Sequence, residues 1–472
     1  MNEINQTTPE RKLYAFRYLA RIVLQAETPL SIGSGESNIQ TDSPVIRDIN
    51  GLPFIPGTSL AGILRHAVDS LEQEKVNAVF GFQSKEGSHT GLGSRLLCTS
   101  ARMIGKDGQT VLDGLQNINY TDPFYKAFQN LPIRQHVCIN DKGTAKDRGK
   151  FDEEVVYKGT RFCFEIELIG EKEEEVTFFR DQLLPRMQHV SFRIGSGTRN
   201  GHGEVSIYSY KERTLDLREK EDLKAYLKKS SSLSSEFKWK DNSKTTAVPS
   251  VNNGWTTYSV ELRPDDFFLF GSGFGDDAAD MTPVKEKVVS YNENKGKISD
   301  SYILIPASSV KGALSHRIAY YYNREVGYFA DAKNDKGGIG KENYTIRQLF
   351  GYEGDVKNPE TTPAPGNVLF SDILIEPNNG QQDKLLNHVS IDRFTGGAIT
   401  GALFSEKTTW GNQQVFSLTI HVKGEILNNP QIKNAFEYAL TDLCEGLLPL
   451  GGGTNRGNGR FTGKWEQTTQ NK

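Results

Sequence analysis

Two aspartates at matching places are the residues of this 472-residue sequence that could do chemistry. Asp42 lies in TDSPVIRD and Asp280 lies in DDAADMTPVKEK, each shortly before a proline and each at the same distance from a preceding Gly-Ser-Gly turn. A carboxylate at such a place could hold a divalent metal ion or orient a nucleophile. A lone loop aspartate is, however, usually a turn or cap residue. The sequence shows no His-Glu metal cluster, Cys-x-x-Cys pair or Ser-His-Asp set beside them.

A glycine-rich stretch is the second candidate. Residues 194–203 read IGSGTRNGHG, and a partner stretch, TNRGNGRF, begins at Thr454. The predicted order around it is helix, loop, strand, which is the reverse of what a dinucleotide loop requires, and the Gly-Lys-Ser/Thr ending of a P-loop is missing. Glycines expose backbone amides, and Arg199 and Arg456 lie among them, which suits a sugar-phosphate backbone. The alternative is a tight turn without a ligand; an arginine in both copies favours phosphate.

Hydroxyl groups at two predicted helix starts form a third group of candidates. They are Thr58 and Ser59 in PGTSLAG, and Ser308 and Ser309 in PASSVKG. Hydroxyls beside open amides at a helix N-terminus bind phosphate well, but the same residues are ordinary N-caps, and both interpretations stay open. Lys311 strengthens the phosphate interpretation in the second motif. The first motif has Ala61 there, so its contact with phosphate would depend on Arg65.

Two long polar segments carry basic and aromatic residues. They read INDKGTAKDRGKFDEEVVYKG and IDRFTGGAITGALFSEKTTWG. The basic candidates are Lys146, Arg148 and Lys150 in the first segment and Arg393 in the second. Basic groups near an aromatic or apolar tip suit a hairpin that wedges into a single nucleic-acid strand; a mobile surface loop is the alternative. His136 and His388 open the strand-like stretches that lead into these segments, where we expect structural roles rather than catalysis.

These motifs recur because the sequence contains two copies of one pattern. The matching blocks begin at Ile55 and Ile305, at His136 and His388, and at Thr198 and Thr454. They keep their order and are separated by 250, 252 and 256 positions, a drift that loop insertions explain. The predicted first domain spans residues 1–215 and the second spans 255–472. Residues 216–254 form the predicted linker, which starts with a short helix at Asp216–Lys229 and continues with Ser, Asn and Lys.

Each copy predicts the same series of elements. A strand leads to a Gly-Ser turn and a helix, then middle strands, the polar segment, a strand, a second helix, the glycine loop and a last strand. This is the split βαβ or ferredoxin-like order, in which one sheet face is open and commonly binds RNA. We therefore expect an α+β fold with two ferredoxin-like (RRM-like) domains in tandem, each with a glycine-rich loop and a hairpin.

Composition sets wider limits. With 36% hydrophobic and 24% charged residues, the sequence is that of an ordinary soluble globular protein without a membrane span. The N-terminal MNEINQTTPERK has no apolar core and is not expected to be a signal peptide. Four scattered cysteines argue against a disulfide framework and for the cytoplasm. The net charge of −3 means that any nucleic-acid surface must be local.

With these motifs in place, the sequence resembles the RAMP proteins of type III CRISPR–Cas complexes. The likeness is greatest to their repeated backbone subunit, with two units fused as in type III-D systems. The residues that carry it read IGSG, TDSPVIRD, GLPFIPGTSLAGILRH, HVSIDRFTGGAITGALF, GSGTRNGHGEV and GGGTNRGNGRF. It covers nearly the whole chain outside the linker and an insertion around residues 327–341.

The resemblance implies a ribonucleoprotein subunit of antiviral defence that lies along a guide RNA. The core, including Ser34 of the first Gly-Ser-Gly turn, would grip the guide backbone, and the hairpin, called the thumb in this family, would kink the guide–target duplex. At each kink an aspartate is needed to cut target RNA, here Asp42 and Asp280, with Mg²⁺ or another divalent metal. Asp280 matches less well, because its loop is one residue longer. Other RAMP-type subunits and a large signature subunit are the expected protein partners.

Three alternatives remain at this point. The first is a subunit of the same complex that binds RNA without cutting it. The second is a guide-processing RAMP endoribonuclease that acts alone, for which His136 would be the catalytic candidate. The third is a carbohydrate or nucleotide enzyme that binds no RNA.

Overall fold

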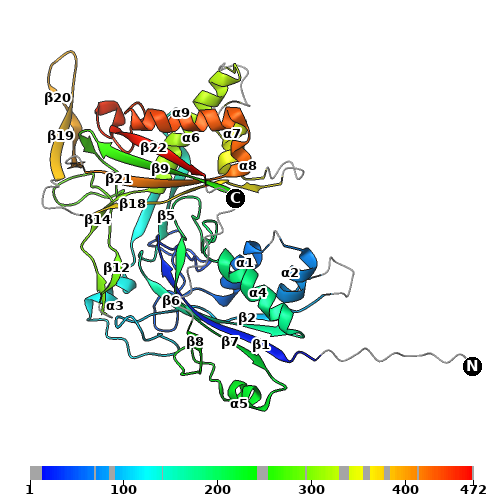
Figure 1. Ribbon diagram of the computed structural model, residues 1–472. Helices are drawn as coiled ribbons and strands as arrows, with labels where there is room; N and C mark the ends of the chain where they lie inside the picture. The colour runs from blue at the N-terminus through cyan, green and yellow to red at the C-terminus, as the bar shows by residue number, and fades with distance from the viewer. Residues whose placement is uncertain are drawn as a thin grey trace, which may run out of the picture.

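The computed structural model describes residues 13–68, 71–83, 91–140, 142–241, 254–292, 295–328, 338, 340–354, 362–376, 383–411 and 414–469. These residues form an α+β protein built around two antiparallel sheets, one in each half of the chain, which confirms the predicted class. Figure 1 shows the two sheets one above the other, with the main helices of each half on the same side of its sheet.

The first sheet is made by strands from the whole first half. Its strands are β1 (Phe16–Ala26), β2 (Leu96–Cys98), β3 (Arg102–Met103), β6 (Arg161–Gly170), β7 (Val205–Asp216) and β8 (Lys240–Asp241). They lie in the order β2-β6-β1-β7-β8, and β3 also pairs with β6. Alternate apolar residues of β1 and β6 face the helices α1 (Gly57–Ala67), α2 (Gln73–Phe80) and α4 (Glu173–Arg186), with which they form one core.

The second sheet repeats this arrangement. Its strands are β9 (Trp255–Pro264), β17 (Val368–Phe370), β21 (Phe416–Lys423) and β22 (Phe461–Thr469), in the order β17-β21-β9-β22. The strands at corresponding places in the two copies therefore occupy corresponding places in the two sheets. Its helices are α6 (Ala307–Glu325), α7 (Tyr344–Phe350), α8 (Gly424–Leu427) and α9 (Pro430–Cys444), and α6, α7 and α9 share a second core with the sheet.

Each half also carries a long hairpin outside its sheet. These hairpins are β4 (Ile133–Ile139) with β5 (Ala145–Glu154), and β19 (Asp383–Ile391) with β20 (Ala398–Trp410). These hairpins contain most of the two polar segments of the sequence. They are the hairpins predicted to act as thumbs. Figure 1 shows β19–β20 projecting away from the second sheet.

The remaining elements are short. They are α3 (Pro123–Gln129), α5 (Lys220–Lys228), β10 (Phe267–Phe268), β11 (Lys285–Glu286), β12 (Val289–Asn292), β13 (Lys295–Ile298), β14 (Tyr302–Ile305), β15 (Gly351–Tyr352), β16 (Ala364–Pro365), β18 (Ile373–Ile375) and the 3-10 turns η1 (Gly340–Glu342) and η2 (Thr454–Arg456). The apolar residues Leu60, Leu64, Val68 and Leu71, whose spacing suits one helix face, are divided between α1 and the segment that joins it to α2. Helix α1 ends at Ala67, because the backbone of Val68 leaves the helical region (φ −109°, ψ 8°), and α2 follows as a separate helix.

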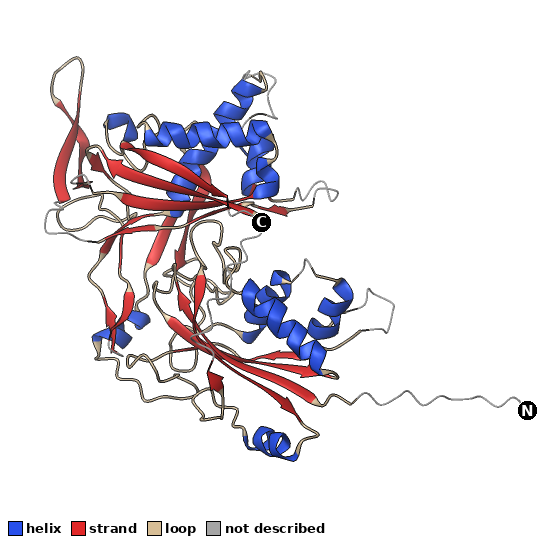
Figure 2. Cartoon of the chain, viewed as in Figure 1, coloured by secondary structure: helices blue, strands red, loops and turns tan. Residues whose placement is uncertain are grey.

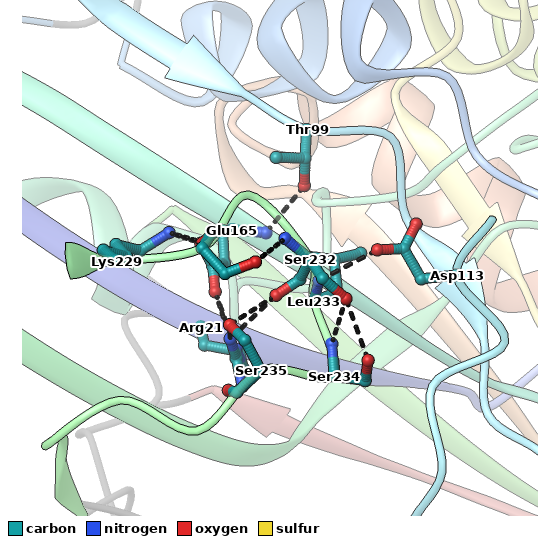
Figure 3. Close-up of polar contacts among 10 residues, drawn as sticks. Arg21, Thr99, Asp113, Glu165, Lys229, Ser232, Leu233, Ser234 and Ser235 are labelled. Atoms are coloured by element: carbon teal, nitrogen blue, oxygen red, sulfur yellow. Dashed lines mark hydrogen bonds and ion pairs between the residues drawn. The ribbon is translucent and has the colours of Figure 1, made fainter. Parts of the chain in front are cut away.

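The outer face of the first sheet is not open, contrary to our expectation for the domain type. The chain that follows α5 crosses this face and places Leu233, which is 3% exposed, in a small apolar cluster with Cys163. The carboxylate of Glu165 in β6 forms ion pairs with Arg21 and Lys229, each at 2.6 Å. Figure 3 shows both basic side chains directed at this carboxylate. The segment expected to be a plain linker is thus packed on the sheet as far as residue 241.

The two halves interlock through the hairpin β12–β13 of the second half. Val289 is buried in the core of the first half, and its amide donates to the carbonyl of Lys158 (2.9 Å). The ring of Tyr291 contacts that of Phe124, with centroids 6.2 Å apart, and lies under the guanidinium of Arg161. The first core is therefore completed by the second half. In the part of the chain that the structure describes, no helix is long and apolar enough to cross a membrane.

Candidate functional site

The loop that carries Asp42 is fixed to the thumb hairpin of the first half. The amide of Asp42 donates to Oδ1 of Asp152 (2.8 Å), and the amide of Asp152 donates to Oδ2 of Asp42 (3.1 Å). Two residues after Asp152, the amide of Glu154 donates to the carbonyl of Ser43, the residue that follows Asp42 (3.0 Å). The Asp42 side chain is exposed. Strand β5 thus sets the position of an accessible carboxylate.

The loop that carries Asp280 has the same relation to the second hairpin. The amide of Ser405 donates to Oδ2 of Asp280 (2.8 Å), and the amide of Asp280 donates to the hydroxyl of Ser405 (3.1 Å). The hydroxyl of Ser405 also donates to Oδ2 of Asp280 (3.0 Å), and the bonds from the amide and the hydroxyl of Ser405 lower the pKa of Asp280. Met281 pairs in parallel with Glu406, as Ser43 pairs with Glu153. The extra residue before the proline therefore leaves the register of Asp280 unchanged.

A buried glutamate follows each of these contacts on the hairpin. Glu153 is 7% exposed and Glu406 is 1% exposed. Nε2 of His136 lies 3.0 Å from Glu153, and Nε2 of His388 lies 3.1 Å from Glu406. Each imidazole is stacked on the phenylalanine two positions before the glutamate, with centroids 4.9 and 4.8 Å apart. The two histidines thus hold the bases of the two hairpins together.

The glycine loops reach the same glutamates. In the second half the side chains of Asn458 and Arg456 each donate to Glu406 at 3.2 Å. In the first half Nδ1 of His202 lies 3.4 Å from Glu153. A Cβ at Gly197 would lie 2.6 Å from the His202 ring, and one at Gly453 would lie 2.8 Å from the Asn458 amide. Both glycines also have positive φ, so the loop needs glycine there to admit the side chain that meets the glutamate.

Electrostatics keep the first of these glutamates charged. Burial would raise the pKa of Glu153, but the hydrogen bond from His136 and the neighbouring imidazoles lower it to about 2. Burial and the charge of Arg134 lower the pKa of His202 to about 3, so its ring is neutral. Arg134 can only donate, and its Nη1 lies 2.8 Å from Nε2 of His202. The remaining proton of His202 is therefore on Nδ1, which faces Glu153.

The hydroxyls at the two helix starts are not N-caps. The N-cap residues are Pro56 and Pro306, and neither helix has a side-chain cap. Thr58 and Ser309 are exposed, and Ser59 and Ser308 are half-buried. The capping interpretation is therefore wrong for both helices, and the phosphate interpretation stays a prediction. Arg65 points to the end of α2, where it donates to the carbonyl of Gly81 (2.7 Å).

Arg199 of the first half bonds to the second half, and Lys311 of the second half bonds to the first half. Arg199 donates to the carbonyl of Gly366 (3.0 Å), and Lys311 donates to Asn200 of the first glycine loop (2.9 Å). Burial, and then the charge of Arg199, lower the pKa of Lys311 to about 8. Both cations lie at the junction of the halves, whereas Arg456 is 41% exposed on the second glycine loop.

The predicted RNA-binding residues of the hairpins lie along the two thumb hairpins. Lys146, Arg148 and Lys150 are exposed on β5, and Arg393 is exposed at the tip of the second hairpin beside Phe394, which is 98% exposed. Ser34 is half-buried and accepts a hydrogen bond from the amide of Glu36 (3.2 Å). The structure thus separates the basic candidates into exposed thumbs, an exposed second loop and a covered junction.

Sequence reasoning missed the partners of the two aspartates. The partners are Asp152 in the first half and Ser405 in the second, and it also missed the buried glutamates that follow them, Glu153 and Glu406, which contact the histidines. A signal existed, since Phe-Asp-Glu and Phe-Ser-Glu recur 253 positions apart, one more than the histidines. Among the described residues, no group of three or more His, Cys, Asp or Glu could hold a metal ion by itself.

Comparison with known proteins matches both halves of the chain to one family. A family model described as the RAMP superfamily matches residues 23–206 and 269–462, one region in each half. The chain is also similar to the protein described as CRISPR system Cms endoribonuclease Csm3 of Streptococcus thermophilus. The two are 28% identical over 209 residues, which cover 41% of this chain and 87% of that protein.

Proposed function

This chain belongs to the RAMP superfamily, and we propose on that premise that it is a guide-RNA-binding backbone subunit of a type III CRISPR complex that cuts target RNA. The Csm3 relative is an endoribonuclease of such a system by its description. In this proposal each half is a ferredoxin-like RAMP domain, and the fusion of two such units is the type III-D-like feature. Its partners are guide RNA, target RNA, other RAMP-type subunits and a large signature subunit.

One observation carries the proposal of two cleavage sites. An exposed aspartate is joined through reciprocal hydrogen bonds to the thumb hairpin in both halves, at Asp152 and at Ser405. A turn residue without a further role would not need the same partner strand in two copies whose loops differ in length. The bonds fix the aspartate relative to the thumb, which is the element proposed to kink the duplex.

The proposed chemistry depends on position. A nucleotide displaced by a thumb can place its own 2′-hydroxyl in line with the adjacent phosphorus, and positioning supplies much of the rate. A bound divalent metal would stabilise charge on the phosphate oxygens. Mg²⁺ is commonly bound by one or two carboxylates together with substrate phosphates, so Asp42 with Asp152, or Asp280 beside Ser405, fits such an ion once RNA is present. The sequence and the contacts leave the aspartates as either metal ligands or proton acceptors.

The test is target cleavage by the assembled complex with Mg²⁺. Asp42→Ala and Asp280→Ala should each remove one distinct cut and leave the other, while the neighbouring Asp277→Ala should leave both. Guide RNA recovered with the purified complex should be unchanged in amount. If neither Asp42→Ala nor Asp280→Ala alters the pattern, the chain is an RNA-binding scaffold and the catalytic proposal is wrong.

The guide-processing alternative is weaker in this structure. Its catalytic candidate, His136, has a side chain that is only 10% exposed, placed against Glu153 and stacked on Phe151. A histidine held in this way is suited to stabilising the hairpin base rather than to removing a proton from an attacking hydroxyl. Cleavage of repeat RNA by the isolated chain, lost in His136→Ala, would restore that alternative.

A further inference from the structure

We propose that the two buried glutamates, Glu153 and Glu406, are positioning residues for the two candidate cuts. Each joins the glycine loop of its half to the hairpin strand that holds the aspartate loop. The inference rests on the proposed function of Asp42 and Asp280. In each half it assigns a residue that does not contact RNA but fixes the position of the aspartate.

The first argument is that each glutamate is contacted from separate segments of its half. Glu153 contacts His136 of β4 and His202 of the glycine loop. Glu406 contacts His388 of β19, and also Arg456 and Asn458 of the glycine loop. Residues far apart in sequence thus converge on one carboxylate in each half.

The second argument is the short distance along the strand from the glutamate to the contact with the aspartate. The residue directly before each glutamate, Asp152 or Ser405, makes the reciprocal bonds to the aspartate loop. The glutamate itself also pairs in parallel with the residue after the aspartate, Ser43 or Met281. A shift of the glutamate backbone therefore moves the aspartate loop with it.

The third argument is chemical. Loss of either carboxylate leaves buried donors without an acceptor, and an unsatisfied buried donor is costly. The hairpin base must then move to find new partners. A displacement of about 1 Å at a reacting group can lower a rate by about 100-fold. We therefore expect Glu153→Ala and Glu406→Ala each to slow one cut by about 10- to 100-fold.

The experiment is single-turnover target cleavage by the complete ribonucleoprotein complex with Mg²⁺, with both cuts followed in the same reaction. The variants are Glu153→Ala, Glu153→Gln, Glu406→Ala and Glu406→Gln, with Asp147→Ala on the exposed surface of β5 as the control. Asp42→Ala and Asp280→Ala identify which cut belongs to which half. Target-RNA affinity and guide content are measured on every complex.

The expected result is a slowed cut in the half that carries the substitution, an unchanged cut in the other half, and target affinity within about 2- to 3-fold of wild type. Glutamine keeps an acceptor oxygen and should retain more activity than alanine at each position. This split between rate and affinity, and the partial rescue, would not follow from a general loss of structure.

Three results would overturn the inference, and they are distinguishable. If Asp42→Ala removes its cut and neither Glu153 variant slows it, the aspartate proposal stands and the positioning role is wrong. If the glutamate variants weaken target binding or guide content together with both cuts, their role is structural rather than positioning. If neither aspartate variant removes a cut, the proposed function itself fails and the inference fails with it.

Discussion

Replacement of Arg134 should loosen the junction between the two halves. Arg134 lies at the base of the first hairpin, and its side chain is 4% exposed. It pairs with Glu286 of β11 at 2.8 Å and with Asp372, between β17 and β18, at 2.7 Å, both from the second half. The side chains of these acids are 4% and 2% exposed. One cation thus pairs with two buried acids across the junction, and burial raises the pKa of one of them, Asp372.

The expected magnitude follows from what remains after the substitution. Arg134→Met removes the cation and leaves both acids buried, and loss of one partner of a buried ion pair typically costs about 3–5 kcal/mol. For a chain of this length, such a loss corresponds to a fall in Tm of roughly 3–5 °C. The triple variant with Glu286→Gln and Asp372→Asn removes all three charges. The amide side chain introduced by Asp372→Asn would still offer an oxygen to the amide of Ala307, which now donates to Oδ1 of Asp372 at 2.8 Å.

The assay is urea unfolding and calorimetry of the isolated full-length chain. Arg134→Met should lose about 3–5 kcal/mol, and the triple variant should recover to within about 1–2 kcal/mol of wild type, since a neutral buried set is often as stable as an ionic one. Arg218→Met breaks an exposed pair with Asp216, which solvent screens, and should lower the stability far less than Arg134→Met does. An Arg134→Met chain as stable as Arg218→Met would refute the reasoning.

Two further predictions concern the same junction. Folded Lys311 has its pKa lowered from 10.5 to about 8, so between these values the unfolded chain binds a proton that the folded chain lacks, and stability rises with pH. Urea unfolding across this window should show that rise in wild type relative to Lys311→Met, and parallel profiles would contradict it. Gly201 and Gly457 are counterparts with φ of +101° and +96°, but only a Cβ at Gly201 would overlap neighbours, 2.6 Å from Ala307 and 2.7 Å from Asp372. Gly201→Ala should therefore lose at least about 1 kcal/mol more in thermal unfolding than Gly457→Ala, and equal losses would show that the junction does not constrain this loop.

Much of the sheet architecture could be predicted from the sequence because it depends on local pattern and repetition. The first strand (β1, β9), the first helix (α1, α6), the strand after the polar segment (β6, β21) and the last strand (β7, β22) follow the predicted order in both copies. The partners of the two aspartates could not be predicted in the same way, because they depend on pairing across more than a hundred residues. The counterparts Asp152 and Ser405 also differ in type, so a search for identical residues passes over them.

Features of the junction were beyond sequence reasoning for a different physical reason. An arginine in a glycine loop can bind phosphate or donate to a carbonyl, and only packing decides between them. Arg199 meets the carbonyl of Gly366, while Arg456 stays exposed. The same holds for the segment after α5, whose Ser-rich composition is that of a linker. Leu233 in its apolar cluster, the rings of Trp239 and Phe237 under Arg21 and Arg213, and the charge of Lys229 hold it against the sheet.

The two candidate sites have different surroundings, and this difference bears on what the repeated contacts are for. At the first site a chain of contacts runs from Glu153 through His202 and Arg134 to Asp372 of the second half. The position equivalent to Arg134 is Leu386, and the second glycine loop instead supplies the exposed Arg456 to its own glutamate. The aspartate, hairpin and glutamate contacts nevertheless keep the same register in both halves. Junction packing therefore cannot be the reason for that register, which agrees with the proposal that each half cuts target RNA at its own site.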